Sequence, residues 1–360
     1  MAAPPDPTDP RRGDRHPESG GKHRILFVCG SINQTKQMHE VARELPGHDH
    51  AFTPYYCDPP LEWVRRLGLA EFTVAGEKLV RRCLDYLRRE GLPVDHGGRR
   101  GPYDLVVSCS DLVVQQLARR TRLVVVQEGI LDPEGWEYRL WRRFPFLPRW
   151  IAGTATTGLS LAYDRFCVAS EGYREHFEAR GVPRERIAVT GIPNFDDSRR
   201  FLKNEFPHRG CVLVCTSDAR ETLKRDDRTA FLRRCLEIAA GRPLVFKLHP
   251  NEDEERATRE IRAVAPGALV FARGSAEEMI ANCDVLVTQY SSTVFVGLAL
   301  GKECHSYWDL DHLRRLLPVQ NGRAARNVAA VCREVLAGSP ARQRETPALT
   351  GLAFPEPEVS

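Results

Sequence analysis

Three apolar stretches in the second half of the chain, CVLVCT (211–216), PLVFKLH (243–249) and DVLVT (284–288), decide the fold class. Each is short, rich in Val, Leu and Phe, and too apolar to be half exposed, which is typical of strands in a parallel sheet covered on both faces. Segments of helical period lie between them, near 228–240 and 252–264. This alternation of strand and helix predicts an open α/β sheet.

The same alternation runs through the first half and continues to residue 336. Further strands are predicted at RILFVC (24–29), DLVVSC (104–109), RLVVVQ (122–127), RFCVAS (165–170), ALVFA (268–272) and ECHSYW (303–308). Further helices are predicted at 34–45, 71–89, 112–119, 171–180, 276–281, from about 291, and at 323–336. We therefore predict two tandem doubly wound, Rossmann-type domains, with ligands bound in the cleft between them beyond the carboxyl ends of the strands.

Residues 191–210, GIPNFDDSRRFLKNEFPHRG, separate the two halves, because they combine prolines, glycines and charges without periodicity. The predicted organisation is a disordered tail (1–22), an acceptor-side domain (23–195), a linker (196–209), a nucleotide-donor-binding domain (210–338) and a second disordered tail (339–360). The last predicted helix is also a candidate for packing back onto the first domain.

Composition excludes several classes of protein. Apolar residues make up 42% and charged residues 28% of the 360 positions, as in soluble globular proteins. The net charge of +4 is too small to indicate a nucleic acid partner. The eleven cysteines form an odd set without a repeated CxxC spacing, which favours reduced, buried thiols in a cytoplasmic protein over disulfides or a metal site. We expect neither a signal peptide nor a membrane span, because the chain has no suitable apolar run.

Polar residues directly follow the predicted strands, where the ends of parallel strands converge in space. They are Gly30-Ser31, Ser110-Asp111, Gln127-Glu128-Gly129, Thr216-Ser217-Asp218, His249-Pro250 and Tyr290-Ser291-Ser292. We therefore expect them to line the cleft between the domains.

The serine pair at 291–292 begins a predicted helix, where free backbone N–H groups and the helix dipole favour a bound phosphate. The alternative is an ordinary serine N-cap. His249 can donate to the same phosphate, although a histidine after a strand is also commonly structural. We assign nucleotide or phosphate binding to Lys247, Thr216, Ser217, Ser291, Ser292 and Thr293, and a catalytic role to His249.

At this point the sequence resembles known families. KLHP (247–250) followed by DVLVTQYSSTVF (284–295) is similar to the HP and SS motifs of CDP-glycerol glycerophosphotransferases, polysialyltransferases and Kdo transferases. The resemblance covers about residues 210 to 310 and implies the two-domain GT-B fold, with the histidine and the serine pair on the phosphate of a cytidine nucleotide donor. Gln289 departs from the Asp that glycerophosphotransferases usually have.

A second resemblance extends over about residues 24 to 310, to the non-hydrolysing UDP-N-acetylglucosamine 2-epimerases, which share the fold. It is carried by RILFVCGS, VVSCSD, VVVQEGIL, the stretch from RFCVAS to GIPNFDD, and LALGKE. It implies that Asp111 and Glu128 occupy the positions of two acids of that family. The family's catalytic histidine is replaced by Ser217-Asp218, and its GGIQEE segment is SSTVFV here (291–296), which argues against unchanged epimerisation.

Glu128 and Asp111 are the predicted bases for an acceptor hydroxyl. Glu128 is favoured because it follows four apolar residues and precedes Gly129, which leaves room for a ligand. The alternative for Asp111 is to cap the helix predicted from Leu112. Gly30, Ser31 and Gly129 are assigned to the acceptor side.

Residues 136–150, WEYRLWRRFPFLPRW, mix aromatic side chains with arginines. Such a mixture suits a membrane surface or a polyanionic acceptor. The alternative is an amphipathic helix whose Trp and Leu side chains face the core and whose arginines are solvated.

Taken together, these patterns predict a metal-independent GT-B-type transferase without a cofactor, moving a sugar or glycerophosphate unit from a nucleotide-sugar or CDP-alcohol donor to a glycan or lipid-linked acceptor. The predicted setting is cell-envelope synthesis in the cytoplasm, with possible peripheral contact at the inner face of the membrane. The alternatives are a 2-epimerase-like enzyme and a non-catalytic nucleotide-sugar binding protein.

Overall fold

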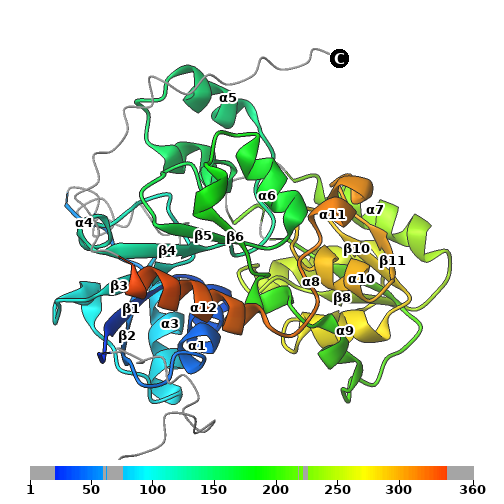
Figure 1. Ribbon diagram of the computed structural model, residues 1–360. Coiled ribbons are helices and arrows are strands. Elements are labelled where there is room, and N and C mark those ends of the chain that lie inside the picture. The colour runs from blue at the N-terminus through cyan, green and yellow to red at the C-terminus, as the bar shows by residue number, and fades with distance from the viewer. Residues whose placement is uncertain (1–20, 60–61, 63–75, 218, 222–225, 339–360) are drawn as a thin grey trace, which may run out of the picture.

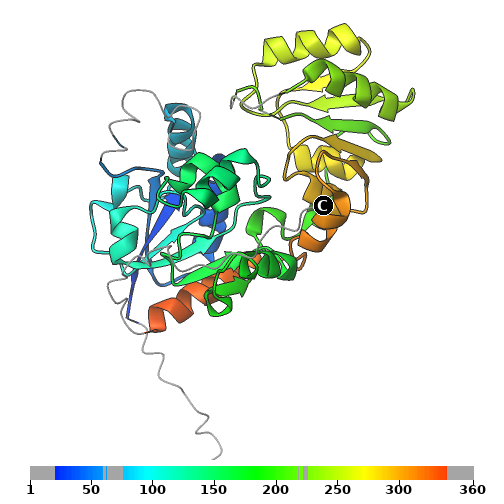
Figure 2. The ribbon, with the colours of Figure 1, turned by 90° about the horizontal axis from the view of Figure 1, so that it is seen from above.

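The computed structural model describes residues 21–338 apart from 60–61, 63–75, 218 and 222–225. The predicted tails therefore lie almost entirely outside the described residues. Two parallel sheets, each with helices on its faces, form two halves of the molecule (Figures 1 and 2). The two predicted Rossmann-type sheets are confirmed, and the architecture is GT-B-like.

The first sheet has six strands in the order β2-β1-β3-β4-β5-β6, all parallel. Its strands are β1 (Arg24–Cys29), β2 (Asp49–Pro54), β3 (Leu105–Ser108), β4 (Arg122–Val126), β5 (Arg165–Val168) and β6 (Ile187–Val189). β2 and β6 are absent from the sequence prediction. Both are edge strands of the sheet, and β2 pairs on its outer side only through one bridge between Phe52 and Val94, so neither needs a long apolar run.

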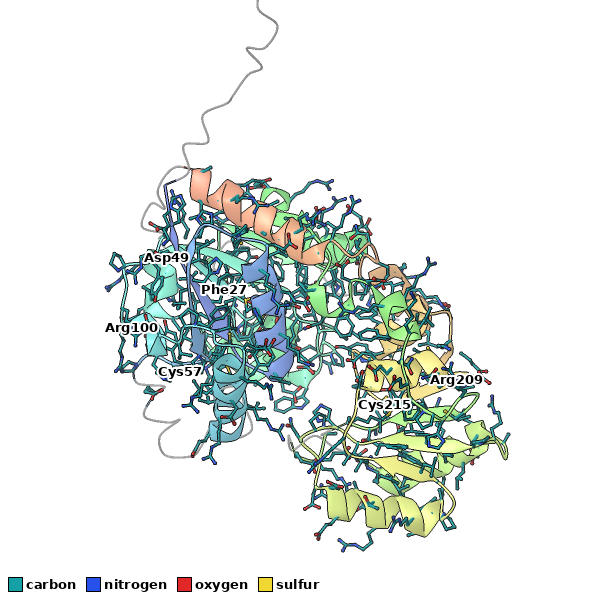
Figure 3. All side chains as sticks on the ribbon, turned by 90° about the horizontal axis from the view of Figure 1, so that it is seen from below. Phe27, Asp49, Cys57, Arg100, Arg209 and Cys215 are labelled. Carbon is teal, nitrogen blue, oxygen red and sulfur yellow. The ribbon has the colours of Figure 1, made fainter. Side chains whose placement is uncertain are left out.

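The second sheet has five parallel strands in the order β11-β10-β7-β8-β9. Its strands are β7 (Val212–Cys215), β8 (Leu244–Lys247), β9 (Leu269–Phe271), β10 (Val285–Thr288) and β11 (Glu303–His305). Phe27 of β1 lies inside the first half and Cys215 of β7 inside the second (Figure 3). All eleven cysteines are free thiols, and ten of them are buried.

Helices cover both sheets. Those between the strands of the first sheet are α1 (Ile32–Arg43), α3 (Glu77–Arg89), α4 (Gln116–Arg120), α5 (Trp136–Arg143) and α6 (Glu171–Glu178). Those after β7 are α7 (Arg228–Ala239), α8 (Glu254–Val264), α9 (Ala276–Asn282), α10 (Val294–Ala299), α11 (Leu310–Leu316) and α12 (Ala324–Ala337). The sequence prediction omitted α11. No described helix is long and apolar enough to cross a membrane.

The last helix belongs to the first half. α12 follows the second sheet in the chain, yet it packs against α1, β4 and β5 (Figure 2, orange-red). Its buried residues Val328, Ala329 and Cys332 share one apolar cluster with Ile25 and Phe27. The chain thus crosses between the halves twice, once at 190–211 and once at 317–323.

Candidate functional site

A cavity of about 230 Å³ lies where the two halves meet. Most of its wall comes from the carboxyl ends of the first sheet, and Ser292 enters from the second half. The lining residues are Asn33, Gln34, Cys109, Ser110, Leu112, Glu128, Gly129, Ile130, Leu131, Thr154, Thr157, Asn194, Phe195 and Ser292. Hydroxyl and amide groups dominate its polar surface, and Glu128 supplies the one charged group among these residues.

Two side chains from the start of α1 hold the Glu128 carboxylate. Ser31 donates its hydroxyl to Oε1 at 2.9 Å, and Gln34 donates its amide to Oε2 at 2.5 Å. Ser31 is also the N-cap of α1, since its Oγ accepts the Gln34 backbone N–H at 3.2 Å. Gly30 connects this cap to β1. Of the predicted acceptor-side residues Gly30 and Ser31, Ser31 contacts the carboxylate.

Burial raises the pKa of Glu128, while the hydrogen bonds from Gln34 and Ser31 lower it. The net shift is upward because loss of solvent around the carboxylate outweighs the two donors. A carboxylate with a raised pKa, fixed orientation and access to a cavity is suited to accept a proton.

Gly129 allows the two halves to approach closely. A Cβ at this position would lie 2.6 Å from Oγ of Ser292. The next residue, Ile130, donates its backbone N–H to the same Oγ at 3.0 Å. In the chain between the halves, Phe195 packs against Phe295 of α10, with ring centroids 6.1 Å apart. Glu128, Gly129 and Ser292 are therefore brought together, although 162 residues separate Ile130 from Ser292.

The structure does not bring Asp111 to the cavity. Its side chain is 0% exposed. Its carboxylate pairs with Arg149 at 3.1 Å and accepts the backbone N–H groups of Gly158 at 2.9 Å and Ser160 at 3.0 Å. It does not cap a helix at Leu112 either, because α4 begins four residues later, at Gln116. Asp111 anchors the loop before β5, so of the two predicted acids Glu128 alone lines the cavity.

The predicted nucleotide-binding residues of β7 and β8 meet in a buried network at the carboxyl end of the second sheet. Glu252 accepts the Thr216 hydroxyl, the His249 backbone N–H at 2.9 Å and Arg228 Nη2 at 2.6 Å. Ser217 donates to Oε1 of Gln289 at 2.8 Å. Asp218 lies outside the described residues.

Three strand ends are thereby connected. Gln289, after β10, donates in turn to Asp226 at 2.8 Å, and Asp226 pairs with Arg228 at 3.2 Å. Arg228 thus links the loops that follow β7, β8 and β10. Gln289, which departs from the glycerophosphotransferase pattern, fits as a neutral link between the Ser217 hydroxyl and the Asp226 carboxylate.

Lys247 is buried, and backbone carbonyls accept hydrogen bonds from its ammonium group. Its Nζ donates to the backbone carbonyls of Leu248 at 2.7 Å and Ala272 at 3.2 Å. Burial lowers its pKa. This lysine therefore connects the chain after β8 with the chain after β9.

The helix after the serine pair begins three residues later than predicted. α10 begins at Val294 and has six residues. Ser291 Oγ lies 2.9 Å from the Thr293 hydroxyl and accepts the Thr293 N–H at 3.3 Å, so this turn is closed by its own side chains. Ser292 points into the cavity, and Ser291 and Thr293 do not line it.

Sequence reasoning missed Gln34, Asn194, Arg228 and Glu252. Gln34 lies one turn after Ser31, and Glu252 three residues after His249, so both could have been sought next to polar strand ends. Asn194 and Arg228 carry no such signal, because tertiary contacts alone place them. Within the described residues, no three His, Cys, Asp or Glu side chains lie close enough together to hold a metal ion.

Neither a protein-family profile nor a curated protein matches the sequence. Solved structures do match the fold. UDP-GlcNAc 2-epimerase from Neisseria meningitidis, bound to UDP-GlcNAc, is 12% identical with a TM-score of 0.52 and covers 86% of this chain and 100% of its own. A putative UDP-N-acetylglucosamine 2-epimerase from Listeria monocytogenes is 13% identical with a TM-score of 0.54, covering 87% and 96%. The wall teichoic acid polymerase TagF is 11% identical with a TM-score of 0.53, covering 87% and 88%. At such identities the likeness shows the GT-B-like fold.

Proposed function

We propose that the chain is a GT-B-type transferase that moves a sugar or glycerophosphate unit from a nucleotide-activated donor to an acceptor hydroxyl, in the synthesis of a cell-envelope glycan or glycolipid. One observation carries the proposal: Glu128, with its raised pKa, faces a cavity at the junction of two Rossmann-type halves. Ligands of such sheets bind at this junction.

In this mechanism Glu128 accepts the proton of the acceptor hydroxyl as that oxygen attacks the donor. Ser31 and Gln34 keep the carboxylate in one orientation, so little reorganisation is needed at the moment of transfer. Ser292 donates from the second half, next to the leaving phosphate.

The second half would hold the nucleotide. His249, Ser291 and Thr293 follow β8 and β10, where a donor phosphate would lie, and the Arg228–Glu252 pair fixes the turn that carries His249. We propose that Thr216 and Ser217 support this pocket through Glu252 and Gln289. Lys247 could reach a phosphate only after leaving its two carbonyl partners.

The lining of the cavity favours a neutral hydroxyl-bearing group. None of the described residues that line it carries a positive charge. An anionic group there would lie beside the Glu128 carboxylate without a partner, which is unfavourable. A sugar ring or polyol therefore fills the cavity, and the phosphates of the donor lie at its edge, on the side of Ser292.

A 2-epimerase-like reaction is the second candidate. The retained Glu128-Gly129 pair at the cavity favours it, because the same carboxylate could remove the proton next to the anomeric centre. The substrate of that reaction would be UDP-N-acetylglucosamine, and no acceptor would be needed. We place either reaction in the cytoplasm, where thiols such as the eleven free cysteines stay reduced.

Thermal unfolding with CMP, CDP, UMP, UDP, UDP-GlcNAc and GDP tests these proposals. A nucleotide at about 100 times its Kd adds about 2.7 kcal/mol of stability. Stabilisation by cytidine nucleotides supports transfer from a CDP-activated donor. Stabilisation by UDP-GlcNAc, with deuterium entering carbon 2 in D2O, supports the epimerase. No response to any of them counts against both reactions with these nucleotides and favours a non-catalytic protein that binds another ligand.

Glu128→Gln then tests the base. We expect turnover to fall by at least about a hundredfold, because general base catalysis contributes about 10²–10⁴-fold. The melting shift caused by the nucleotide should remain, since Glu128 does not contact the phosphate site. Unchanged turnover would exclude Glu128 as the base.

A further inference from the structure

The aromatic and basic segment 136–150 exposes an apolar stripe. Trp136 and Leu140 lie one turn apart on one side of α5, Phe144 directly follows this helix, and their exposed fractions are 65%, 37% and 39%. On the opposite side, Tyr138 and Trp141 are buried. The expectation that Trp and Leu side chains face the core thus holds for Trp141 and fails for Trp136 and Leu140.

Two further exposed aromatic side chains follow α5, and the Phe146 ring lies against the Phe144 ring with centroids 5.9 Å apart. Phe146 is 81% exposed and Trp150 48%. Half of the large apolar side chains that are exposed among the described residues fall in this one segment. Soluble proteins rarely gather such groups on a surface without a binding function.

Positive charge accompanies the aromatic rings. Arg139 and Arg143 are exposed, and the Arg143 guanidinium lies over the Phe144 ring, 5.2 Å from its centroid. Glu137 is the one acid in the segment, and Arg149 is paired with the buried Asp111. The exposed surface of the segment is therefore both aromatic and basic.

The connection between β4 and β5, which contains segment 136–150, also forms a wall of the cavity. The segment leaves β4 through Ile130 and Leu131 and returns through Thr154 and Thr157, all of which line the cavity. Asp132 joins the two ends of this connection, because its carboxylate accepts a hydrogen bond from the Thr154 hydroxyl at 2.8 Å. α5 lies at the periphery of the first half, above β4 and β5 in Figure 1.

We propose that segment 136–150 docks on the surface of an anionic phospholipid bilayer. Trp136, Phe146 and Trp150 enter the interface between headgroups and acyl chains, where aromatic rings are favoured. Arg139 and Arg143 lie at the lipid phosphates, and each nearby arginine adds to the attraction of an anionic surface. Resting on the proposed function, this places the cavity next to a membrane, so the acceptor is lipid-linked.

Flotation of the purified chain with vesicles tests the proposal without any donor or acceptor. The two vesicle types are phosphatidylcholine alone and phosphatidylcholine mixed with phosphatidylglycerol. The variant is Arg139→Glu/Phe146→Ser. Its matched control is Arg233→Glu/Leu236→Ser on α7, which likewise changes one exposed arginine and one exposed large apolar residue.

We expect the chain to bind the mixed vesicles, to bind them less at high salt, and to bind phosphatidylcholine at least about tenfold more weakly. The segment variant should lose at least about tenfold in binding, and the control should bind like the unchanged chain. Trp fluorescence of the unchanged chain should shift to shorter wavelength on mixed vesicles.

Equal loss in both variants, or no binding to mixed vesicles, would overturn the proposal. So would a dimer in lipid-free light scattering that the segment variant abolishes, because the occupant would then be a second copy of the chain. Glu128→Gln should bind vesicles normally. A failure of docking is thus distinguishable from a failure of the proposed chemistry.

Discussion

The pKa of the Glu128 carboxylate is set by two opposing effects, burial and hydrogen bonds from two donors. Burial raises its pKa and the Gln34 and Ser31 hydrogen bonds lower it. A base must be ionised, so activity should fall as the pH drops through the raised pKa. Each donor that is removed should move this fall to higher pH, because a hydrogen bond to the charged form favours ionisation.

Gln34→Ala tests this balance. Losing a hydrogen bond to a charged group costs about 1.5–3 kcal/mol, so we expect the acidic limb of kcat/KM against pH to move upward by about one to two units. Gln115→Ala is the control, because that buried amide donates to the Tyr56 carbonyl instead. A limb that stays in place in Gln34→Ala would show that another group controls the acidic limb.

Gly129 and Ser292 form a close contact between the halves. Gly129→Ala brings a Cβ to 2.6 Å from the Ser292 hydroxyl and should cost about 1–3 kcal/mol. Ser292→Ala removes the acceptor of the Ile130 N–H and should cost about 1–3 kcal/mol. The double variant should cost at least about 1 kcal/mol less than the sum, because the clash disappears with the hydroxyl. Urea unfolding of all four proteins measures this coupling, and additive costs would contradict it.

The sequence alone places some of the candidate residues at the cavity correctly and others incorrectly. Glu128 and Ser292 were predictable, because both follow strongly apolar strands and strand ends converge. Asp111 satisfies the same rule, yet Arg149, Gly158 and Ser160 take up its carboxylate. Those partners lie 38 to 49 residues further along the chain, so local pattern contains no trace of them.

At the scale of elements, Asp196 ties the two chain crossings together. Its buried carboxylate accepts the backbone N–H of Ala324 at 2.6 Å and of Gly322 at 3.0 Å, at the start of α12. An acidic side chain at this position accepts hydrogen bonds from N–H groups that have no partner within the helix. The positive end of the helix dipole also stabilises its negative charge.

Asp196→Ala should therefore loosen α12. We expect a loss of about 2 kcal/mol, with faster hydrogen exchange in the first turn of α12. Asp253→Ala is the matched control, since Asp253 caps α8 through the Arg256 N–H at 2.9 Å but is exposed. Its effect should be smaller and confined to α8. Unchanged exchange in α12 would show that packing alone holds the helix.

Element prediction succeeded where the apolar pattern is strong and failed where tertiary contacts supply the order. The central strands β1, β3 and β4 were predictable because both of their faces are buried. β2 reads DHAFTP and was missed, because a strand at the edge of a sheet tolerates polar residues. α4 starts later than predicted, because Asp111 bonds to the loop at 158–160 rather than to the helix.

At the scale of the whole molecule, α12 makes the first half depend on the far end of the chain. Ala329 is 0% exposed and lies in the cluster formed by β1, β3, β4 and α1, although it follows β11 in sequence. Order along the chain alone would assign it to the second half. The apolar period of α12 was visible in the sequence, but no pattern states which sheet it covers.

Ala329→Asp tests this assignment, because a buried unpaired carboxylate is strongly destabilising, on the order of 3 kcal/mol or more. Hydrogen exchange should accelerate in β1, β3 and β4, and β7 to β10 should keep their protection. Ala257→Asp is the control, since Ala257 is 1% exposed in α8 and packs in the cluster of β7, β8 and β10. It should produce the opposite pattern. Faster exchange in the second sheet, or equally in both sheets, would contradict the assignment. The two halves would then unfold as one unit, and α12 would stabilise both halves rather than the first alone.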